Sequence, residues 1–591
     1  MSDEQRMGLA IILMAAVLLL WSRFFKPPVP QKPPEANPSA NVQQPAPGQP
    51  APSAIAAGSQ IAPATSGGEA GQATIPVNEA KGEETIVVQS GLYRVELSNR
   101  GGVVRSWKLD KYRNNENPPK PLELVNFEVA KQLNAWPLSI WLDDPKLAAA
   151  ANSGLYVVTQ GTAAPSSGQS KTATENALPD GTTLQAPAEI DFEWSNGHLH
   201  IVKELKFAKD YQVELDVSAS YDKRPIPFGV SWRGGFGDQS VPSAAALTEV
   251  FYSENEKVTA LTYKKLGVKD HPEVPVQVSG YMDATGIEDT FFTAAFLSNQ
   301  PGITLWDWTQ HYSVTEDGKT TVQPVVEMAA GPQAPGAWNT RLYVGPKKFA
   351  DLDHLNPPLT GLVQYGYTGF IAKPLLWILN WIYKYVPNYG WAIVLLTIVI
   401  NMALFPLKVK SWHSTKRMQK AMPRIKALQE KYKKYSMRDP RRREMQEEMS
   451  AIYKEEGANP IAGCLPQLIQ MPIWFALYRM LQYSIELRHA PWFGWIHDLS
   501  ARDPYYILPI LMTAAMYFMT KMTPQPTVDP AQQKMMALMP LAFGFFFFLY
   551  SSGLVLYIFT SSIVGIAQQL YLNKNDPLPS RSPFKNKPLK A

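Results

Sequence analysis

The sequence predicts a multi-pass α-helical membrane protein that carries a large all-β domain between its first and second transmembrane helices. Three observations predict this fold class: six apolar runs, loops of unequal basic charge, and one long segment in which apolar and polar residues alternate. A run of about 20 apolar residues spans a bilayer as a helix, and alternation is typical of half-buried strands. The six predicted transmembrane helices are 7–25, 391–407, 465–484, 505–520, 536–550 and 553–570.

Residues 1–25 are predicted to form an N-terminal transmembrane anchor. A cleaved signal peptide is the alternative, because Arg6 precedes an apolar core of signal-like length, but no convincing small-x-small cleavage site lies immediately after Trp21. Residues 26–83 are rich in Pro, Ala, Gln and Ser and hold almost no large apolar side chains. We expect this segment to be a flexible linker.

Residues 84–346 are predicted to form the all-β domain, with a sandwich as the expected architecture. Stretches such as ETIVVQSGLYRVEL, HLHIVKELKF and YQVELDVSASY alternate apolar and polar residues, and Asn-Arg-Gly-Gly marks a turn. We expect no metal or catalytic site in this domain, because its histidines lack a ligand-like spacing with Cys or acidic residues. These histidines are His198, His200, His271 and His311.

Residues 347–390 mix Trp, Tyr and Lys with aliphatic residues just ahead of the second apolar run. Aromatic residues and lysines of this kind favour the boundary between lipid and water. The segment is therefore predicted to contain an amphipathic helix that lies in the membrane interface on the outer side.

Basic charge is concentrated in one loop. Between residues 408 and 456 there are fifteen Lys or Arg against seven Asp or Glu, whereas 486–503 hold two basic and three acidic residues. Short loops rich in Lys and Arg stay in the cytoplasm, which places 408–463 inside and the next loop outside. With six spans, both termini are then cytoplasmic, including the basic tail 573–591.

The cytoplasmic loop 408–463 reads as a hairpin of two amphipathic helices, 410–435 and 440–456. Each helix has an apolar stripe, and the two stripes either pack on each other or stay free for other chains. Both alternatives leave a basic outer surface that suits lipid headgroups, ribosomal RNA or nascent chains. Basic residues expected at this surface are Arg441, Arg442 and Arg443.

Polar side chains lie at helical spacing in three of the predicted spans. Thr397 and Asn401 share one helix face with Lys408 near its end, and Gln467 and Gln470 lie three residues apart in another helix. Because polar groups are costly against lipid, these residues should face a hydrated cavity or, alternatively, hydrogen-bond a neighbouring helix. The third polar face, on the last span, carries Tyr557, Thr560, Ser561 and Gln568.

Long motifs in the C-terminal half resemble a known family. They are NPIAGCLPQLIQMPIWFALYRML, ELRHAPWFGWIHDLSARDPYYILPILM, DPAQQKMMALMP and SSGLVLYIFTSSIVGIAQQ. These stretches are similar to the YidC/Oxa1/Alb3 membrane protein insertases, specifically the Gram-negative YidC type. The similarity extends over residues 357–572 and is looser in the β domain and the first anchor.

The resemblance implies an insertase and chaperone that moves hydrophobic segments of newly made proteins into the inner membrane through a polar, lipid-open groove, alone or with the Sec translocon. Five helices within 391–572 would form the insertase core, and the β domain would be periplasmic. The implied partners are nascent membrane proteins, the Sec translocon, the ribosome and anionic lipids, without DNA. No cofactor, metal or enzymatic activity is implied, and Met471 and Pro472 would contact clients.

One position departs from the family pattern. Members commonly carry an arginine in the groove on the second span, and Asn401 occupies the matching position in TIVINMALFPL. Lys408 and Arg479 are the candidates to supply the missing charge. Arg479 would reach the groove only if its helix bends at Pro472; otherwise it would lie at the outer interface or pair near Glu486.

Two other functions compete with this interpretation. A multi-pass transporter of a small solute is the main alternative, because polar faces on several helices could line a path, but no clear internal repeat of helices is found. An intramembrane protease is disfavoured, since the predicted spans contain no histidine and no pair of aspartates.

Overall fold

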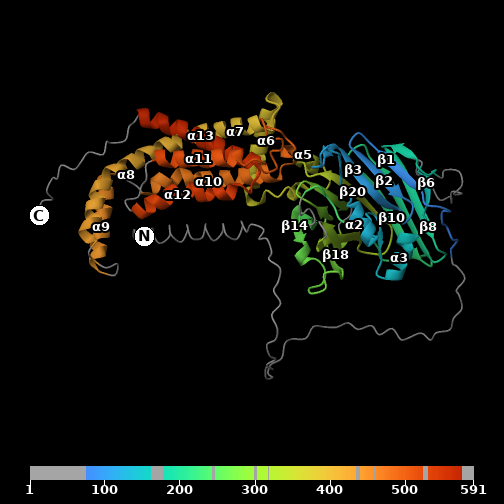
Figure 1. The fold of residues 1–591 in the computed structure, drawn as a ribbon. Coiled ribbons are helices and arrows are strands. Elements are labelled where there is room, and N and C mark those ends of the chain that lie inside the picture. Colours follow the sequence, from blue (N-terminus) through green and yellow to red (C-terminus); the bar gives the residue numbers. More distant parts are fainter. Residues whose placement is uncertain are drawn as a thin grey trace, which may run out of the picture. The chain divides into compact units, whose positions relative to one another are not determined.

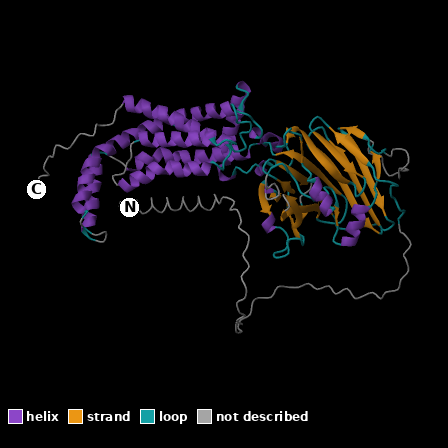
Figure 2. Ribbon diagram, viewed as in Figure 1, coloured by secondary structure: helices purple, strands orange, loops and turns teal. Residues whose placement is uncertain are grey.

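The computed structural model describes a strand-rich region followed by a helical region (Figures 1 and 2). Both belong to one compact unit of the chain, 71–591. The predicted anchor 1–25, the linker up to residue 74 and the tail beyond residue 575 lie outside the described residues. The described residues are 75–161, 178–241, 247–298, 302–316, 319–433, 435, 439–457, 460–523 and 530–575.

The strand-rich region forms three sheets within its described residues. The largest has the antiparallel order β14-β13-β16-β17-β20-β10-β9-β8-β6, with β11 paired to β10. The two smaller sheets have the orders β4-β3-β2-β1-β7 and β15-β18-β19-β12-β5, and β1 and β7 are parallel.

Strands β1, β2, β9 and β10 coincide with the predicted alternating stretches. The large sheet consists of β6 Val157–Gln160, β8 Ala188–Ser195, β9 Leu199–Phe207, β10 Gln212–Tyr221, β11 Arg224–Pro225, β13 Glu249–Glu254, β14 Lys257–Thr262, β16 Ala284–Glu288, β17 Phe292–Ser298 and β20 Trp338–Pro346. The smaller sheets consist of β1 Thr85–Gln89, β2 Tyr93–Ser98, β3 Val103–Arg113, β4 Pro121–Glu123, β5 Ile140–Trp141, β7 Thr183–Gln185, β12 Gly229–Trp232, β15 Val276–Gly280, β18 Ile303–Glu316 and β19 Lys319–Pro332.

The sheets pack on one another as layers of a sandwich. Trp107 of β3 lies against Phe207 of β9, with ring centroids 6.4 Å apart, and against Trp232 of β12 at 6.3 Å. Along β9 every second residue is buried, which is the alternation that the sequence displays. The apolar faces of all three sheets therefore meet in one shared core.

One inward position of β9 holds a lysine instead of an apolar residue. Lys203 is 1% exposed, and its ammonium donates hydrogen bonds to the backbone carbonyls of Gly101, Gly102 and Leu138 at 2.8, 2.9 and 2.7 Å. All three N–H groups of the ammonium are thus used. Burial of this cation is tolerated because each donor has an acceptor.

The prediction of an all-β domain needs a correction, because two short helices lie within it. Helix α2, Phe127–Leu133, begins where the Asn126 side chain accepts a hydrogen bond from the Val129 amide. Helix α3, Pro145–Ser153, follows Asp144, which caps its first turn. A capping side chain followed by proline or helix-forming residues starts a helix locally, even between strands.

A connector of short helices leads from the β domain to the helical region. It comprises α5 Phe349–Asp353, two 3-10 turns and α6 Gly369–Tyr385. Helix α6 buries Leu376 and Leu379 while Phe370 and Trp377 are exposed. This exposed aromatic face has the composition expected of an interfacial helix.

The second predicted span is broken. Helix α7 covers Tyr389–Ala403, the chain bends by 52° at Leu404, and α8 continues over Phe405–Tyr432. The predicted span 391–407 therefore ends earlier and the hairpin helix starts earlier, because Pro406 stands in the first turn of a new helix. The hairpin closes with α9, Arg441–Glu455.

The remaining helices are α10 Pro460–Tyr483, α11 Ile507–Met522, α12 Pro530–Phe547 and α13 Ser552–Asn575. Helix α10 runs as one helix through both of its internal prolines, and α13 packs against α7, α8, α10 and α11. Among the described helices, α13 alone is long and apolar enough to cross a membrane by itself, or two spans qualify if α7 and α8 count as one. Helix α11 and residues 538–547 of α12 are shorter apolar helices.

Candidate functional site: a lysine cluster between α7, α8 and α13

The two polar residues predicted on the second span lie on the buried face of α7. Thr397 and Asn401 are both 0% exposed. The Thr397 hydroxyl donates to the Ile393 carbonyl at 2.6 Å, and the Asn401 amide donates to the Thr397 carbonyl at 2.9 Å. The same Asn401 nitrogen lies 3.3 Å from the Ser561 hydroxyl of α13. The polar face of α7 is thus turned toward α13.

Lys408, one of the two candidate charges, reaches back to this face. Its ammonium donates to the side-chain oxygen of Asn401 at 3.0 Å and to that of Gln568 at 2.9 Å. Gln568 in turn donates to the Asn401 carbonyl at 3.1 Å. We call the four residues Asn401, Lys408, Ser561 and Gln568 the Lys408 cluster.

The break at Leu404 lies between the two residues that it brings together. Seven residues of unbroken helix would separate Asn401 and Lys408 by roughly 10 Å along the axis. The 52° bend turns the start of α8 relative to α7, and the lysine side chain closes the remaining distance. Local chain geometry therefore assembles the Lys408 cluster from neighbouring helices.

Lys408 is a half-buried cation with neutral partners. Within the part of the chain that the structure describes, both acceptors of its ammonium are amide oxygens, of Asn401 and Gln568. Amide oxygens satisfy hydrogen bonds but do not neutralise charge. The Lys408 cluster therefore keeps a positive charge beside the packed apolar helices.

The other predicted groove residues lie on α13 and α10. Tyr557 and Thr560 are buried in α13, and Gln470 of α10 lies beside the Tyr557 hydroxyl. Met471 is half-buried and Pro472 is exposed on the same helix. Of Gln467 only the backbone lies within the described structure.

Arg479, the second candidate charge, has different neighbours from Lys408. Its guanidinium contacts the Gln364 carbonyl of the connector at 3.5 Å and lies 5.6 Å from the Tyr483 ring centroid. It does not join the Lys408 cluster. Of the two candidates, the structure therefore brings only Lys408 to Asn401.

In the hairpin the two apolar stripes pack on each other. Leu428, Tyr432 and Met445 are buried together. On the outer surface the Arg441 guanidinium pairs with Asp439 at 3.1 Å, and Arg443 lies 3.6 Å from Glu447. For Arg442 the described structure includes the backbone alone.

A group of carboxylates that could in principle hold a metal ion lies in the β domain. Side-chain oxygens of Glu189, Asp191 and Glu204 are within 4.8 Å of one another, and all three residues are half-buried. Lys206 already lies 3.6 Å from Glu189. Acidic groups of this kind are common in proteins without a metal, and nothing else in the described residues points to an ion here.

Two known families match the chain, and their matches meet inside α6. The family described as YidC periplasmic domain matches residues 85–378, and the family described as 60Kd inner membrane protein matches residues 381–578. The fold and these matches define a bacterial inner-membrane protein with a β-rich periplasmic domain.

Full-length relatives are more specific. The membrane protein insertase YidC of Syntrophus aciditrophicus is 32% identical, with 97% of this chain and 99% of the relative aligned. That of Methylobacillus flagellatus is 31% identical, with 97% of each chain aligned. That of Wolinella succinogenes is 43% identical over 48% of this chain and 50% of its own. A solved structure titled as an active YidC insertase has 18% identity and a TM-score of 0.34, with 84% of this chain and 94% of that chain covered.

The chain belongs to the YidC family of membrane protein insertases. Its substrates are membrane proteins, and its function is not enzymatic. The predicted family and function are confirmed, and the alternative of a small-solute transporter is not favoured.

Proposed function

We propose that the chain spans the inner membrane six times with both termini in the cytoplasm, and that it inserts its clients along the Lys408 cluster. The topology is supported by the excess of basic residues in the hairpin loop and the slightly acidic loop that follows α10. Helices α10 to α12 are less apolar or shorter than a lone span requires. Neighbouring helices cover part of their surface, which lowers that requirement.

The observation that carries the proposed site is the ammonium of Lys408, held by two amide oxygens at 3.0 and 2.9 Å. A charged side chain at the centre of a lone helix in lipid costs about 2.5 to 3.5 kcal/mol. The amides of Asn401 and Gln568 reduce this cost without cancelling the charge. The ammonium can therefore attract an acidic segment of a client when that segment enters the helical region.

The same residues explain why an asparagine suffices where relatives commonly carry an arginine. Asn401 supplies the hydrogen-bonding oxygen and Lys408 supplies the charge, so two residues share the role that one arginine plays elsewhere. We propose that the polar surface around the Lys408 cluster is extended by Thr397, Gln467, Gln470, Tyr557 and Thr560. Met471 and Pro472 then contact the apolar part of a client.

The hairpin is proposed to meet the ribosome and anionic lipids. Its apolar stripes are already occupied by each other, which leaves charge as its means of contact. Arg441, Arg442 and Arg443 begin α9 and supply much of that charge. The Sec translocon is proposed as a partner on the family resemblance alone.

The site is tested by comparing Lys408→Met with Lys410→Met, an exposed lysine on the same helix. Insertion is measured in vesicles for two clients that differ only in an acidic or neutral periplasmic segment. Lys408→Met should slow insertion of the acidic client about tenfold, which corresponds to about 1.4 kcal/mol, and should change the neutral client by less than about twofold. Equal losses for both clients, or the same loss in Lys410→Met, would reject the proposed site.

The topology is tested with single cysteines in a Cys464→Ser background, because Cys464 is the chain's one cysteine. Ser414→Cys in α8 and Ser500→Cys in the loop after α10 are labelled with a membrane-impermeant thiol reagent. We expect Ser414→Cys to react only in inverted vesicles and Ser500→Cys only in right-side-out vesicles. Labelling of both positions from one side would contradict the six-span arrangement.

A further inference from the structure

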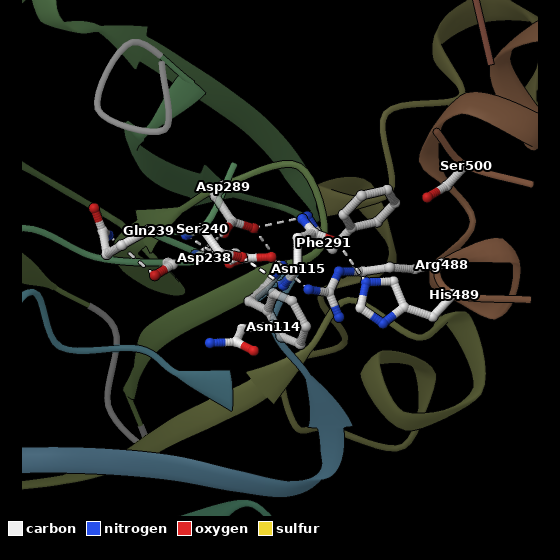
Figure 3. A network of polar contacts seen from close by, with 12 residues as sticks. Asn114, Asn115, Asp238, Gln239, Ser240, Asp289, Phe291, Arg488, His489 and Ser500 are labelled. Atoms are coloured by element: carbon white, nitrogen blue, oxygen red, sulfur yellow. Dashed lines mark hydrogen bonds and ion pairs between the residues drawn. The ribbon is translucent and has the colours of Figure 1, made fainter. Parts of the chain in front are cut away.

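The loop between α10 and α11, residues 484–506, contacts the β domain through two adjacent side chains (Figure 3). The Arg488 guanidinium forms an ion pair with Asp238, and the two side chains are 4% and 5% exposed. The guanidinium also lies 5.4 Å from the ring centroid of Phe292 in β17. Ion pairs at the edge of an interface stay hydrated, so a pair buried to this degree belongs to the centre of a contact.

Hydrogen bonds within the β domain hold Asp238 in position independently of Arg488. Its backbone amide donates to the Asp289 carboxylate at 3.1 Å, and its own carboxylate accepts from the Ser240 amide at 3.0 Å. Gly237 has φ +95°, and a side chain there would stand 2.3 Å from the Asp289 carboxylate. A glycine is therefore required at this position, and the β domain presents a preformed acceptor.

The neighbouring residue, His489, makes a second contact with a different segment of the β domain. Its ring nitrogen Nε2 lies 2.7 Å from the side-chain oxygen of Asn115, and 3.8 Å from Asp498 of its own loop. The backbone amide of Asn115 donates to the Ser240 hydroxyl at 2.7 Å. Both contacts therefore converge on one corner of the β domain, where Ser240 connects Asn115 and Asp238 (Figure 3).

The same loop also contacts the outer ends of α7 and α13. The Leu499 and Ala501 carbonyls accept hydrogen bonds from the Gly553 and Ser552 amides at 2.8 and 2.7 Å, which satisfies two donors at the start of α13. Asn388, the N-cap of α7, donates to the Trp492 carbonyl at 3.1 Å.

The packing between this loop and α7 is close. A side chain at Gly390 of α7 would stand 2.1 Å from the Trp492 ring. The loop is thus fitted against the helix that carries Asn401, and it caps the helix that carries Ser561 and Gln568. We call residues 484–506 the bracket loop.

We infer that the bracket loop sets the spacing of α7 and α13, and that the β domain holds the bracket loop through Arg488 and His489 and stays docked while clients are inserted. Arg488 is then a positioning residue, which acts on insertion through the two helices. This inference rests on the proposed role of the Lys408 cluster for its effect on insertion. The docking itself is testable without that role.

The first test locks the contact. In the Cys464→Ser background, Asn115→Cys and His489→Cys are combined and bridged by a short, reducible bis-methanethiosulfonate reagent, because the native contact joins side-chain tips that two cysteines alone are too short to reproduce. We expect the cross-link to form in the intact protein in membranes and insertion of both test clients to remain within about twofold of the reduced protein. Loss of insertion on cross-linking, reversed by a reductant, would show that the β domain must leave and would overturn the inference. Failure to cross-link would overturn the docking.

The second test opens the contact, with Arg488→Met as the variant and Arg502→Met, an exposed arginine of the same loop, as its control. Arg488→Met leaves the buried Asp238 carboxylate without its cationic partner, so amide exchange should rise about tenfold in the bracket loop and in the first turn of α13. Asp238→Asn combined with Arg488→Met should recover part of that protection. Unchanged exchange at residues 552–555 would overturn the positioning role.

The two inferences fail in different ways. Lys408→Met should impair the acidic client and leave amide exchange at residues 552–555 unchanged, because Lys408 belongs to α8 and contacts α13 at Gln568, far along that helix from the bracket loop. Arg488→Met should raise that exchange and slow both clients alike. A protein in which exchange rises but neither client is slowed would refute positioning while leaving the Lys408 cluster intact.

Discussion

Two lysines away from the surface, one in the β domain and one among the helices, use their charge in opposite ways. Lys203 donates to three backbone carbonyls, on Gly101, Gly102 and Leu138. Lys408 donates to two side-chain amides. Backbone carbonyls move only if the chain unfolds, whereas an amide side chain moves by rotation about single bonds. The β domain therefore uses a lysine as a fixed internal tie, and the helical region keeps one whose partners can be exchanged.

The largest expected effect is the loss of the fixed tie. Lys203→Ala would leave three buried carbonyls without a donor and a cavity beside Tyr156, so it should destabilise the β domain by about 3 to 5 kcal/mol. Unfolding of the β domain in the full-length protein is followed through amide exchange of β9 as denaturant is added. The quantity compared is the denaturant concentration at the midpoint of unfolding. Lys206→Ala, on the exposed face of the same strand, should change stability by less than about 1 kcal/mol. Similar losses of stability in both variants would contradict the stabilising role of Lys203.

The second effect is the pH dependence of that tie. Burial lowers the pKa of Lys203 to about 7, from 10.5 in the unfolded chain. Between these values the unfolded state binds more protons, so the free energy of unfolding should rise with pH, by at most about 3 kcal/mol between pH 7 and 9. The hydrogen bond that a neutral amine loses reduces this gain. Lys203→Met should show a flatter profile, and an equal rise in both proteins would refute the prediction.

Third, the exchangeable lysine should tolerate relocation of its charge. Lys408→Gln alone should slow insertion of an acidic client about tenfold, and Asn401→Arg added to it should recover most of that rate, because the charge returns to the same cluster. Asn401→Arg in the presence of Lys408 places two cations at hydrogen-bonding distance and should lower thermal stability. No recovery in the double variant would mean that Lys408 acts through its packing and not its charge.

A smaller effect is expected where the two regions meet. Burial and Arg488 lower the pKa of His489, against the opposite influence of Asp498 and Asp238. The docked state therefore resists protonation of the ring. Docking should weaken as pH falls through the ordinary histidine pKa of about 6.5 and below, with the loss reaching a few-fold in equilibrium constant. Amide exchange of the bracket loop at pH 7.5 and 5.5, corrected for intrinsic rates, measures this. His489→Gln should show no such change.

The smallest effect belongs to the hairpin surface. Arg441→Glu and Arg443→Glu reverse exposed charges, each worth less than about 1 kcal/mol in stability. Binding of the protein to ribosomes or anionic vesicles should nevertheless weaken, and more so at low salt, where surface charges are least screened. Salt titration of binding gives the answer, and identical curves for variant and parent would exclude a charged contact.

Most of the fold could be predicted from the sequence because its patterns are local. The alternation of apolar and polar residues predicted β9 and β10. The helical spacing of polar residues predicted that Asn401 and Lys408 share one helix face and that Ser561 and Gln568 share a face of the last span. A helix has a fixed period, so residues that share a face along the chain share it in space. What the pattern did not indicate was the turn at Leu404, which joins two of these residues.

Contacts between distant segments could not be predicted. Arg488 and Asp238 are 250 residues apart. Each is an ordinary charged residue in a loop, and pairing depends on how whole domains pack. Lys203 was hidden for a related reason: its position in β9 follows the apolar phase, but only the opposing sheet supplies the carbonyls that make burial of a lysine acceptable. The helices α2 and α3 were missed because a good cap can start a helix within a strand-rich segment.

Gln568 belongs to α13, the last helix described in the chain, and this has a consequence for how the protein itself is made. Synthesis delivers Asn401 and Lys408 well before Gln568 and Ser561, so for the interval between them the amide and the ammonium lack their partners on α13. A nascent copy then carries unsatisfied polar groups next to hydrophobic helices, which is the condition of the substrates it will later serve. We therefore expect insertion of each newly synthesised copy to require an insertase molecule that is already folded in the membrane.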